Sequence, residues 1–210
     1  MADEMLDEYE QGEQARKWLK ENALSLVLGV ALGLAGLVGW QQWQVYQLMH
    51  KAEAAVEYDA LISELGAGLA ATEQRSTDLA ENYSDTAYAT LAQMHLAAQY
   101  LAEDNREQAI AAYQEAVRVA ALPQLRSIAQ LRLARLLLAD GQAQEAINQV
   151  AGLSDGAFAG AAKEVEGDAL VAIGKTDEAR LAYQSALDSL QSDYGLRQMI
   201  DMKLKALGES

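Results

Sequence analysis

Two stretches of this sequence align with each other: LRLARLLLADGQAQEAINQV at residues 131–150 and EVEGDALVAIGKTDEARLAYQSAL at residues 164–187. Each has an apolar helical stripe, a turn that contains glycine, and a second apolar stripe. A third stretch, AQMHLAAQYLAEDNREQAIAAYQEAV at residues 92–117, follows the same pattern, with Asp104 in place of the turn glycine. Three copies of a helix–turn–helix unit predict a helical repeat protein, because one hairpin alone cannot bury its apolar face.

The spacing of small residues indicates the type of repeat. Alignment on Ala109, Ala146 and Ala179 separates the copies by 37 and 33 residues. A small residue stands twelve positions before each of these alanines, and two copies have tyrosine four positions after it and alanine seven after it. This order is typical of tetratricopeptide repeats, in which small residues let two helices cross closely. The second copy departs from it, with Val150 and Leu153 at the last two positions.

The rest of the soluble part is expected to be helical as well. Alanine, leucine, glutamate and glutamine dominate after residue 50, and Pro123 is the only proline. The predicted fold class is therefore all-α: an N-terminal transmembrane helix, then a tetratricopeptide-like α-solenoid with a C-terminal cap helix. The predicted parts of the domain at 44–210 are an irregular leading pair at 44–86, with its second helix at about 73–82, repeats at about 90–123, 127–159 and 160–192, and a cap helix at 193–207.

The transmembrane prediction rests on ENALSLVLGVALGLAGLVGWQQWQ at residues 21–44. No charged residue occurs between Glu21 and Lys51. The run from Ala23 to Trp40 spans about 27 Å as a helix, close to the roughly 30 Å of a bilayer's hydrocarbon core. All three tryptophans flank this run, as expected at the two membrane interfaces: Trp18, Trp40 and Trp43. We expect a permanent span at 22–43 in contact with the lipid bilayer.

A cleaved signal peptide and a buried soluble helix are the alternatives. A signal peptide has a short basic start and a small-x-small cleavage site, whereas this chain begins with the acidic MADEMLDEYEQGEQ and continues in a helical pattern after Trp43. A buried soluble helix needs no aromatic residues at both ends. Both alternatives therefore fit the sequence less well than a span does.

Basic residues near the ends of the span predict its orientation. Arg16, Lys17 and Lys20 precede it, and only Lys51 follows within about 20 residues. The positive-inside rule then places the acidic segment 1–21 in the cytoplasm and residues 44–210 on the other side.

The span also contains a row of small residues that could pack against another membrane helix. Gly29 and Gly33 form a G-x-x-x-G pattern, and the wider set also includes Ala35, Gly36 and Gly39. Glycine is also simply more frequent in membrane helices, so the pattern has two readings.

Composition and motifs argue against catalysis. The net charge of −15 disfavours nucleic-acid binding, and the chain has no cysteine. The sequence Gly152-Leu-Ser-Asp-Gly156 matches a nucleophile elbow by letter, but it follows a helical segment, and His50 and His95 both lie upstream. These two histidines are more typical of solvated side chains than of metal ligands. We expect no catalytic residue, no cofactor and no metal site, and hence a non-enzymatic protein.

What remains is a surface for protein partners. In tetratricopeptide geometry the first helix of each repeat lines the concave face. The candidate residues there are Met94, Leu101, Leu131, Arg135, Leu138, Glu164, Asp168 and Val171. Several are apolar and suit a partner helix or an extended apolar segment. The cap helix or the leading pair could instead fill this groove.

Several segments together resemble a known family. The acidic leader, ARKWLKEN, the span that ends in GVALGLAGLVGW, LRLARLLLADGQAQEA, EGDALVAIGKTDEARLAY and MIDMKLKAL resemble the YfgM-type ancillary subunits of the bacterial SecYEG translocon over essentially the whole chain. The resemblance implies a single-pass protein of the bacterial inner membrane, with a cytoplasmic N-terminus and a periplasmic repeat domain. It also implies three kinds of partner: the SecYEG translocon, a membrane-anchored periplasmic chaperone of the PpiD type, and secreted or membrane client polypeptides.

The function that follows is to link emerging secreted chains to periplasmic chaperones. Two other functions stay open. The acidic leader suggests a regulatory membrane protein that restrains a cytoplasmic regulator of the envelope-stress response. A scaffold for cell-envelope enzymes is the third reading.

Overall fold

The computed structural model describes residues 2–64, 68–153, 156–190 and 194–208, without the side chains of 2–11, 15 and 194. Within these ranges the chain is helical, with turns and no strand, and the all-α prediction is confirmed. It divides into two units, residues 1–50 and 51–210. The helices are α1 (Ala2–Ser63), α2 (Leu69–Asn82), α3 (Ala87–Ala102), α4 (Arg106–Arg118), α5 (Pro123–Ala139), α6 (Ala143–Val150), α7 (Ala159–Ala172), α8 (Thr176–Ser189) and α9 (Tyr194–Gly208), with a 3₁₀ turn, η1 (Gly156–Phe158), before α7.

The first unit consists of the greater part of α1. This helix contains one stretch that is long and apolar enough to cross a membrane, by length and composition. The side chains from Ala23 to Tyr46 are all exposed in the isolated chain, although most of them are apolar. Nothing within the unit buries these apolar side chains, and the hydrocarbon core of a lipid bilayer would remove them from water.

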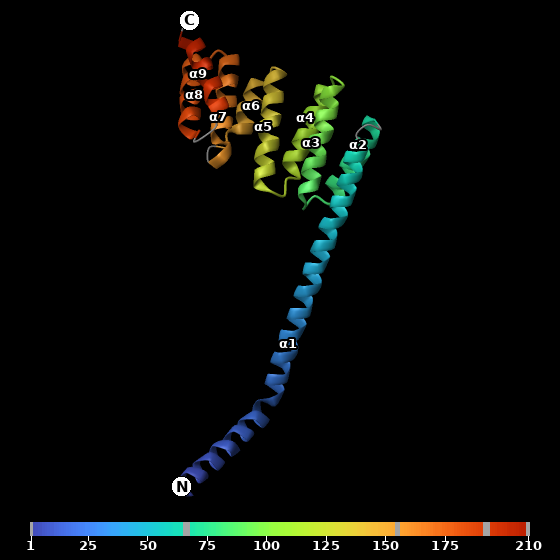
Figure 1. Cartoon of the computed structure of the whole chain (residues 1–210), viewed down its shortest axis with the longest axis vertical. Coiled ribbons are helices and arrows are strands. Elements are labelled where there is room, and N and C mark those ends of the chain that lie inside the picture. Colours follow the sequence, from blue (N-terminus) through green and yellow to red (C-terminus); the bar gives the residue numbers. More distant parts are fainter. Residues whose placement is uncertain (1, 65–67, 154–155, 191–193, 209–210) are drawn as a thin grey trace. The chain divides into compact units, whose positions relative to one another are not determined.

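The second unit is a stack of helical hairpins. The pairs α3–α4, α5–α6 and α7–α8 follow one another in chain order, and α9 packs against α8 (Figure 1). The second helix of each pair also contacts the first helix of the next pair. Most of the buried apolar side chains of α3 to α7 form one continuous core. Residues 51–63 of α1 join α2 and α3 in a smaller core around Ala54, Leu61 and Leu79.

The three repeat hairpins turn in the same way. Asp104, Gly141 and Gly174 all have positive φ, at 57°, 80° and 79°. One residue later, a backbone N–H donates to the carbonyl oxygen five residues back, at 2.8 Å in each hairpin; the pairs are Asn105 to Tyr100, Gln142 to Leu137 and Lys175 to Leu170. This is the Schellman arrangement that ends a helix with a left-handed residue. Glycine suits that conformation, and aspartate tolerates it better than most other residues.

The helices of the third hairpin cross at Gly167. A Cβ atom added there would lie 2.4 Å from Cε1 of Tyr183, closer than real contacts allow. The Tyr183 ring is 2% exposed, and its hydroxyl donates to Oδ1 of Asp168 at 2.6 Å, so the ring has little freedom to retreat. Gly167 is therefore required by close packing.

Two helix boundaries differ from those predicted, and the second repeat has a short second helix. Helix α5 begins at Pro123, where the sequence predicted a repeat from about 127, because proline fits the first position of a helix and needs no N–H partner there. Helix α2 begins at Leu69 and not near Glu73. Helix α6 ends at Val150, so the buried Leu153 lies in the segment after the helix and not in the helix itself.

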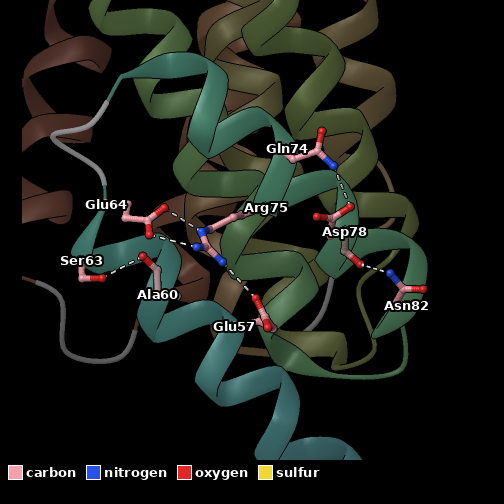
Figure 2. Close-up of polar contacts among 8 residues, drawn as sticks. All are labelled: Glu57, Ala60, Ser63, Glu64, Gln74, Arg75, Asp78 and Asn82. Carbon is pink, nitrogen blue, oxygen red and sulfur yellow. Dashed lines mark hydrogen bonds and ion pairs between the residues drawn. The ribbon is translucent and has the colours of Figure 1, made fainter.

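Arg75 joins the end of α1 to α2 (Figure 2). Its Nε and Nη2 donate to the two carboxylate oxygens of Glu64 at 2.8 and 2.9 Å, and its Nη1 donates to Glu57 at 3.0 Å. Hydrogen bonding to Arg75 lowers the pKa of the Glu64 carboxyl. The guanidinium of Arg75 thus links α2 to Glu57 in α1 and, through a bidentate pair, to Glu64 just after α1.

A second charged network fixes the cap helix. Nζ of Lys203, on α9, donates to Glu164 and to Asp168 of α7, the latter at 2.6 Å. Glu164 is 3% exposed and also accepts from Nη2 of Arg135, on α5, at 3.4 Å. A buried carboxylate of this kind depends on its cationic partners. The network therefore links three helices, α5, α7 and α9.

Substitution of Gly167 by alanine is expected to destabilise the protein. Overpacking against Tyr183 costs about 1–3 kcal/mol, and the higher helix propensity of alanine offsets only up to about 1 kcal/mol. Thermal unfolding of the full chain in detergent, followed by circular dichroism, should show a lower midpoint. Gly152→Ala is the matched control, because a Cβ at Gly152 meets no atom within 4 Å. Equal midpoints for the two variants would contradict the close crossing.

Stability should fall in alkaline solution. Burial lowers the pKa of Lys203, but its hydrogen bonds to Asp168 and Glu164 outweigh burial and raise the pKa above the usual value. The ammonium therefore stabilises the fold fully below the pKa of free lysine, about 10.4, and this stabilisation is lost as pH rises through the higher value in the folded protein. Burial, and then the hydrogen bond to Asp168, also raises the pKa of Tyr183. The protonated hydroxyl therefore stabilises the fold too, and this stabilisation is likewise lost as pH rises.

Unfolding midpoints measured between about pH 9 and pH 12 test this expectation. The decline should be shallower in Lys203→Met, which has no ammonium to lose. Lys175→Met is the control, because Lys175 only pairs with Glu178 at the surface, at 3.0 Å. A decline as steep in Lys203→Met as in the native chain would refute the role of this ammonium.

Candidate functional site

The eight candidate residues of the concave face lie on α3, α5 and α7, at three repeat-equivalent levels. Leu101, Leu138 and Val171 stand three residues before the left-handed turn residue of each hairpin. Leu101 is 38% exposed and Val171 41%, and Leu138 is half-buried. We call these three side chains the apolar row. An exposed alanine follows each of them, at 102, 139 and 172.

A second level lies deeper in the molecule. Met94, Leu131 and Glu164 are 5%, 6% and 3% exposed. Met94 and Leu131 belong to the main core, because this level of each first helix packs toward the neighbouring hairpin. These three residues offer a partner almost no surface, which the repeat spacing alone did not reveal.

The charged candidates form an internal network. Arg135 and Asp168 are the more exposed members, and both are joined through Glu164 and Lys203. The structure thus brings Arg135, Glu164 and Asp168 together, but as partners of one another and of α9. Lys203, on the cap helix α9, is the member of this network that the sequence analysis did not find.

The edge next to the apolar row is acidic. Glu103, Asp104 and Asp140 are all exposed where α3 and α5 end. Asp104 lies 3.7 Å from Arg106, an open surface pair that contributes little. A partner segment on the apolar row would therefore meet carboxylates at one end of the helices, which favours basic residues.

The histidines take part in ring contacts. The centroid of the His95 ring lies 5.9 Å from that of Tyr58, which also contacts Tyr88. Burial, and then the charge of Arg132, lowers the pKa of His95, so its neutral form is favoured. In the first unit, His50 stacks on Tyr46 with a centroid distance of 5.9 Å.

No group of three His, Cys, Asp or Glu side chains suited to a metal occurs among the described residues. The letter match to a nucleophile elbow follows α6, and its Ser154 and Asp155 lie outside the described residues.

The membrane candidates lie in the first unit. The side chains of Trp18, Trp40 and Trp43 are 56%, 58% and 52% exposed, and the rings of Trp40 and Trp43 are 5.1 Å apart. Apart from chain neighbours and the nearby backbone of the helix itself, no atom lies within 4 Å of a Cβ added at any of four glycines: Gly29, Gly33, Gly36 and Gly39. Together with Ala35 they leave an open strip on the helix, where the predicted helix packing in the membrane stays a prediction.

Known proteins resemble this chain along its length. A protein of Escherichia coli K12 named ancillary SecYEG translocon subunit is 26% identical to this chain over 201 residues, which cover 96% of this chain and 97% of that protein. The protein of the same name from Haemophilus influenzae is 28% identical, and the match covers 96% of this chain and 98% of that protein. The relative of the same name from Aggregatibacter actinomycetemcomitans is 25% identical, with 83% and 85% covered. These relatives confirm the resemblance predicted from the sequence.

Solved structures agree with the fold. Crystal structures of TPR-like repeats from Podosopora anserina superpose with TM-scores of 0.57 and 0.56 at 20% identity, covering 76% of this chain and 87% of theirs. At that identity they support the fold alone. The model of the tetratricopeptide repeat-like domain matches residues 16–209, and the chain belongs to that family.

Proposed function

We propose that this protein is a non-enzymatic accessory subunit of the SecYEG protein-export translocon in a bacterial inner membrane. The observation that carries the proposal is the similarity, over 96% of the chain, to relatives named for that role. The architecture suits it, because one apolar helix can hold a helical-repeat platform at the membrane. In this role the protein contributes binding surfaces, and the chemistry of export belongs to its partners.

The span confines the repeat domain beside the channel. Arg16, Lys17 and Lys20 favour a cytoplasmic N-terminus, which puts the repeats in the periplasm, where exported chains emerge. Confinement matters because a tethered binder acts at an effective concentration of roughly millimolar, so a weak contact suffices.

The apolar row supplies the contact surface. Leu101 on α3 and Val171 on α7 are exposed apolar side chains, and the half-buried Leu138 lies on α5, the first helix of the hairpin between them. Such a row suits an apolar segment of the translocon, of a client chain, or of a membrane-anchored periplasmic chaperone of the PpiD type. Residues 44–210 carry 13 Lys and Arg against 24 Asp and Glu, so basic partners are favoured. The protein thereby links emerging chains to chaperones.

Photo-crosslinking tests the contact surface. A photoreactive amino acid at Leu138, in the full chain in membranes, should capture translocon subunits, a periplasmic chaperone or secretory chains, identified by mass spectrometry. The same group at Leu181 is the control, because Leu181 is 67% exposed but lies on α8, a second helix of its hairpin. Equal capture at Leu138 and Leu181, or no export component from Leu138, would contradict the proposal.

A topology measurement tests the orientation separately. Alkaline phosphatase fused after Ser210 should be active, because that enzyme folds only in an oxidising compartment. A green fluorescent protein fusion at the same place, exported in the unfolded state, should stay dark. The reverse pattern would place the repeats in the cytoplasm and favour a regulatory role over the proposed one.

A further inference from the structure

A groove lies between α2 and α4, with α3 as its floor. It has a volume of about 370 Å³. Its deepest side chains come from all three helices and are at most 5% exposed: Ala80 of α2, Gln93 and Leu96 of α3, and Ala112 of α4. Thr77, Gln108 and Ala111 line its open rim. The groove belongs to none of the surfaces predicted from the sequence.

Small side chains create the hollow. Ala80 and Ala112 form its opposite walls, and Ala111 stands at its edge. The repeat alignment places Asn148 of α6 and Leu181 of α8 at the position of Ala111, so the other two hairpins carry larger side chains there. Walls of alanine allow the backbone of a docking helix to approach closely while its apolar side chains enter the groove.

The rim of the groove is acidic. Glu81 stands on the α2 side and Glu115 on the α4 side. Arg118, the one basic residue of the lining, donates two hydrogen bonds to Glu115, which holds the pKa of that carboxyl below its usual value. These two charges largely cancel. The negative charge of Glu81 is then left at the rim.

One end of the groove adds a further carboxylate. Tyr100 lines the groove, and its hydroxyl donates to Glu73 of α2. Burial, and then this hydrogen bond, raises the pKa of Tyr100 to about 12, so the hydroxyl stays protonated and keeps Glu73 in place. The groove therefore presents Leu96 and alanine side chains beside two carboxylates, those of Glu73 and Glu81, while Arg118 of the lining is paired with Glu115.

We propose that this groove binds an amphipathic helix of a partner protein, with small or aliphatic residues toward Leu96 and Ala112 and with Lys or Arg toward Glu81. Charge complementarity identifies this occupant, because the rim carboxylates repel nucleic acid and anionic lipid headgroups. The site is separate from the apolar row, and its existence does not depend on the export role. It would let the protein hold two partners at once.

A model helix tests the site directly. The probe is a fluorescent synthetic helix of about four turns, with leucine and alanine on one face and lysines along its edge. A second helix with glutamate in place of lysine is the matched probe. Binding to the full chain in phosphatidylcholine nanodiscs is measured by fluorescence anisotropy, with empty nanodiscs subtracted. The lysine helix should bind, and the glutamate helix should bind at least about tenfold more weakly.

A steric variant separates the groove from the rest of the surface. Ala111→Trp fills the rim and should weaken binding of the lysine helix about tenfold or more. Asn148→Trp places the same side chain at the equivalent position of the next hairpin and should leave binding unchanged. Equal affinities for the two variants, or equal affinities for the lysine and glutamate helices, would overturn the proposal.

A charge variant covers the case in which tryptophan disturbs the fold. Glu81→Lys should weaken the lysine helix about tenfold or more. Asp188→Lys changes the net charge by the same amount at an exposed site on α8, and it should have only a small effect. If both lysine variants weaken binding alike, attraction by the whole acidic chain explains it and the groove site is refuted.

Discussion

The close crossing of two helices at small residues is the constraint on which the repeat domain depends. Ala109, Ala146 and Ala179 are completely buried, and the first helices carry a buried Ala97, Ala134 or Gly167 twelve residues earlier. Where the bulky partner is Tyr183, even a methyl group on Gly167 has no room. Each crossing fixes the tilt of its hairpin, so it also decides which side chains of the next hairpin are buried and which remain open.

The helical elements were predictable from local patterns in the sequence, whereas burial depth and contacts between distant residues were not. The spacing of Ala109, Ala146 and Ala179 predicted three hairpins, and Gly141 and Gly174 marked where two of the first helices end. Burial depth was not visible, since Met94 in the core and Leu101 at the surface are both apolar residues of one helix. The pairing of Lys203 with Glu164 joins residues 39 positions apart, which no local pattern encodes.

The polar chemistry of the domain divides it into surfaces with different uses. At the C-terminal end, the carboxylates of Glu164 and Asp168 pair with Lys203, which holds the cap helix on the last repeat. Around the groove between α2 and α4, carboxylates outnumber the cations of the lining. The apolar row lies on other helices from those that carry the groove rim. A carboxylate in this domain can thus stabilise the fold when a cationic side chain of the same chain pairs with it, or remain available to a basic partner protein when none does.

The shortness of α6 has a mechanical consequence. Its eight residues make it the shortest α-helix among the described residues, and it stands in the middle of the stack. In a one-dimensional array, stability is a sum over neighbouring interfaces, so the interface with the fewest turns opens most easily. The second hairpin therefore contributes a helix of little more than two turns, so α5 provides most of the surface by which this hairpin joins its neighbours in the array.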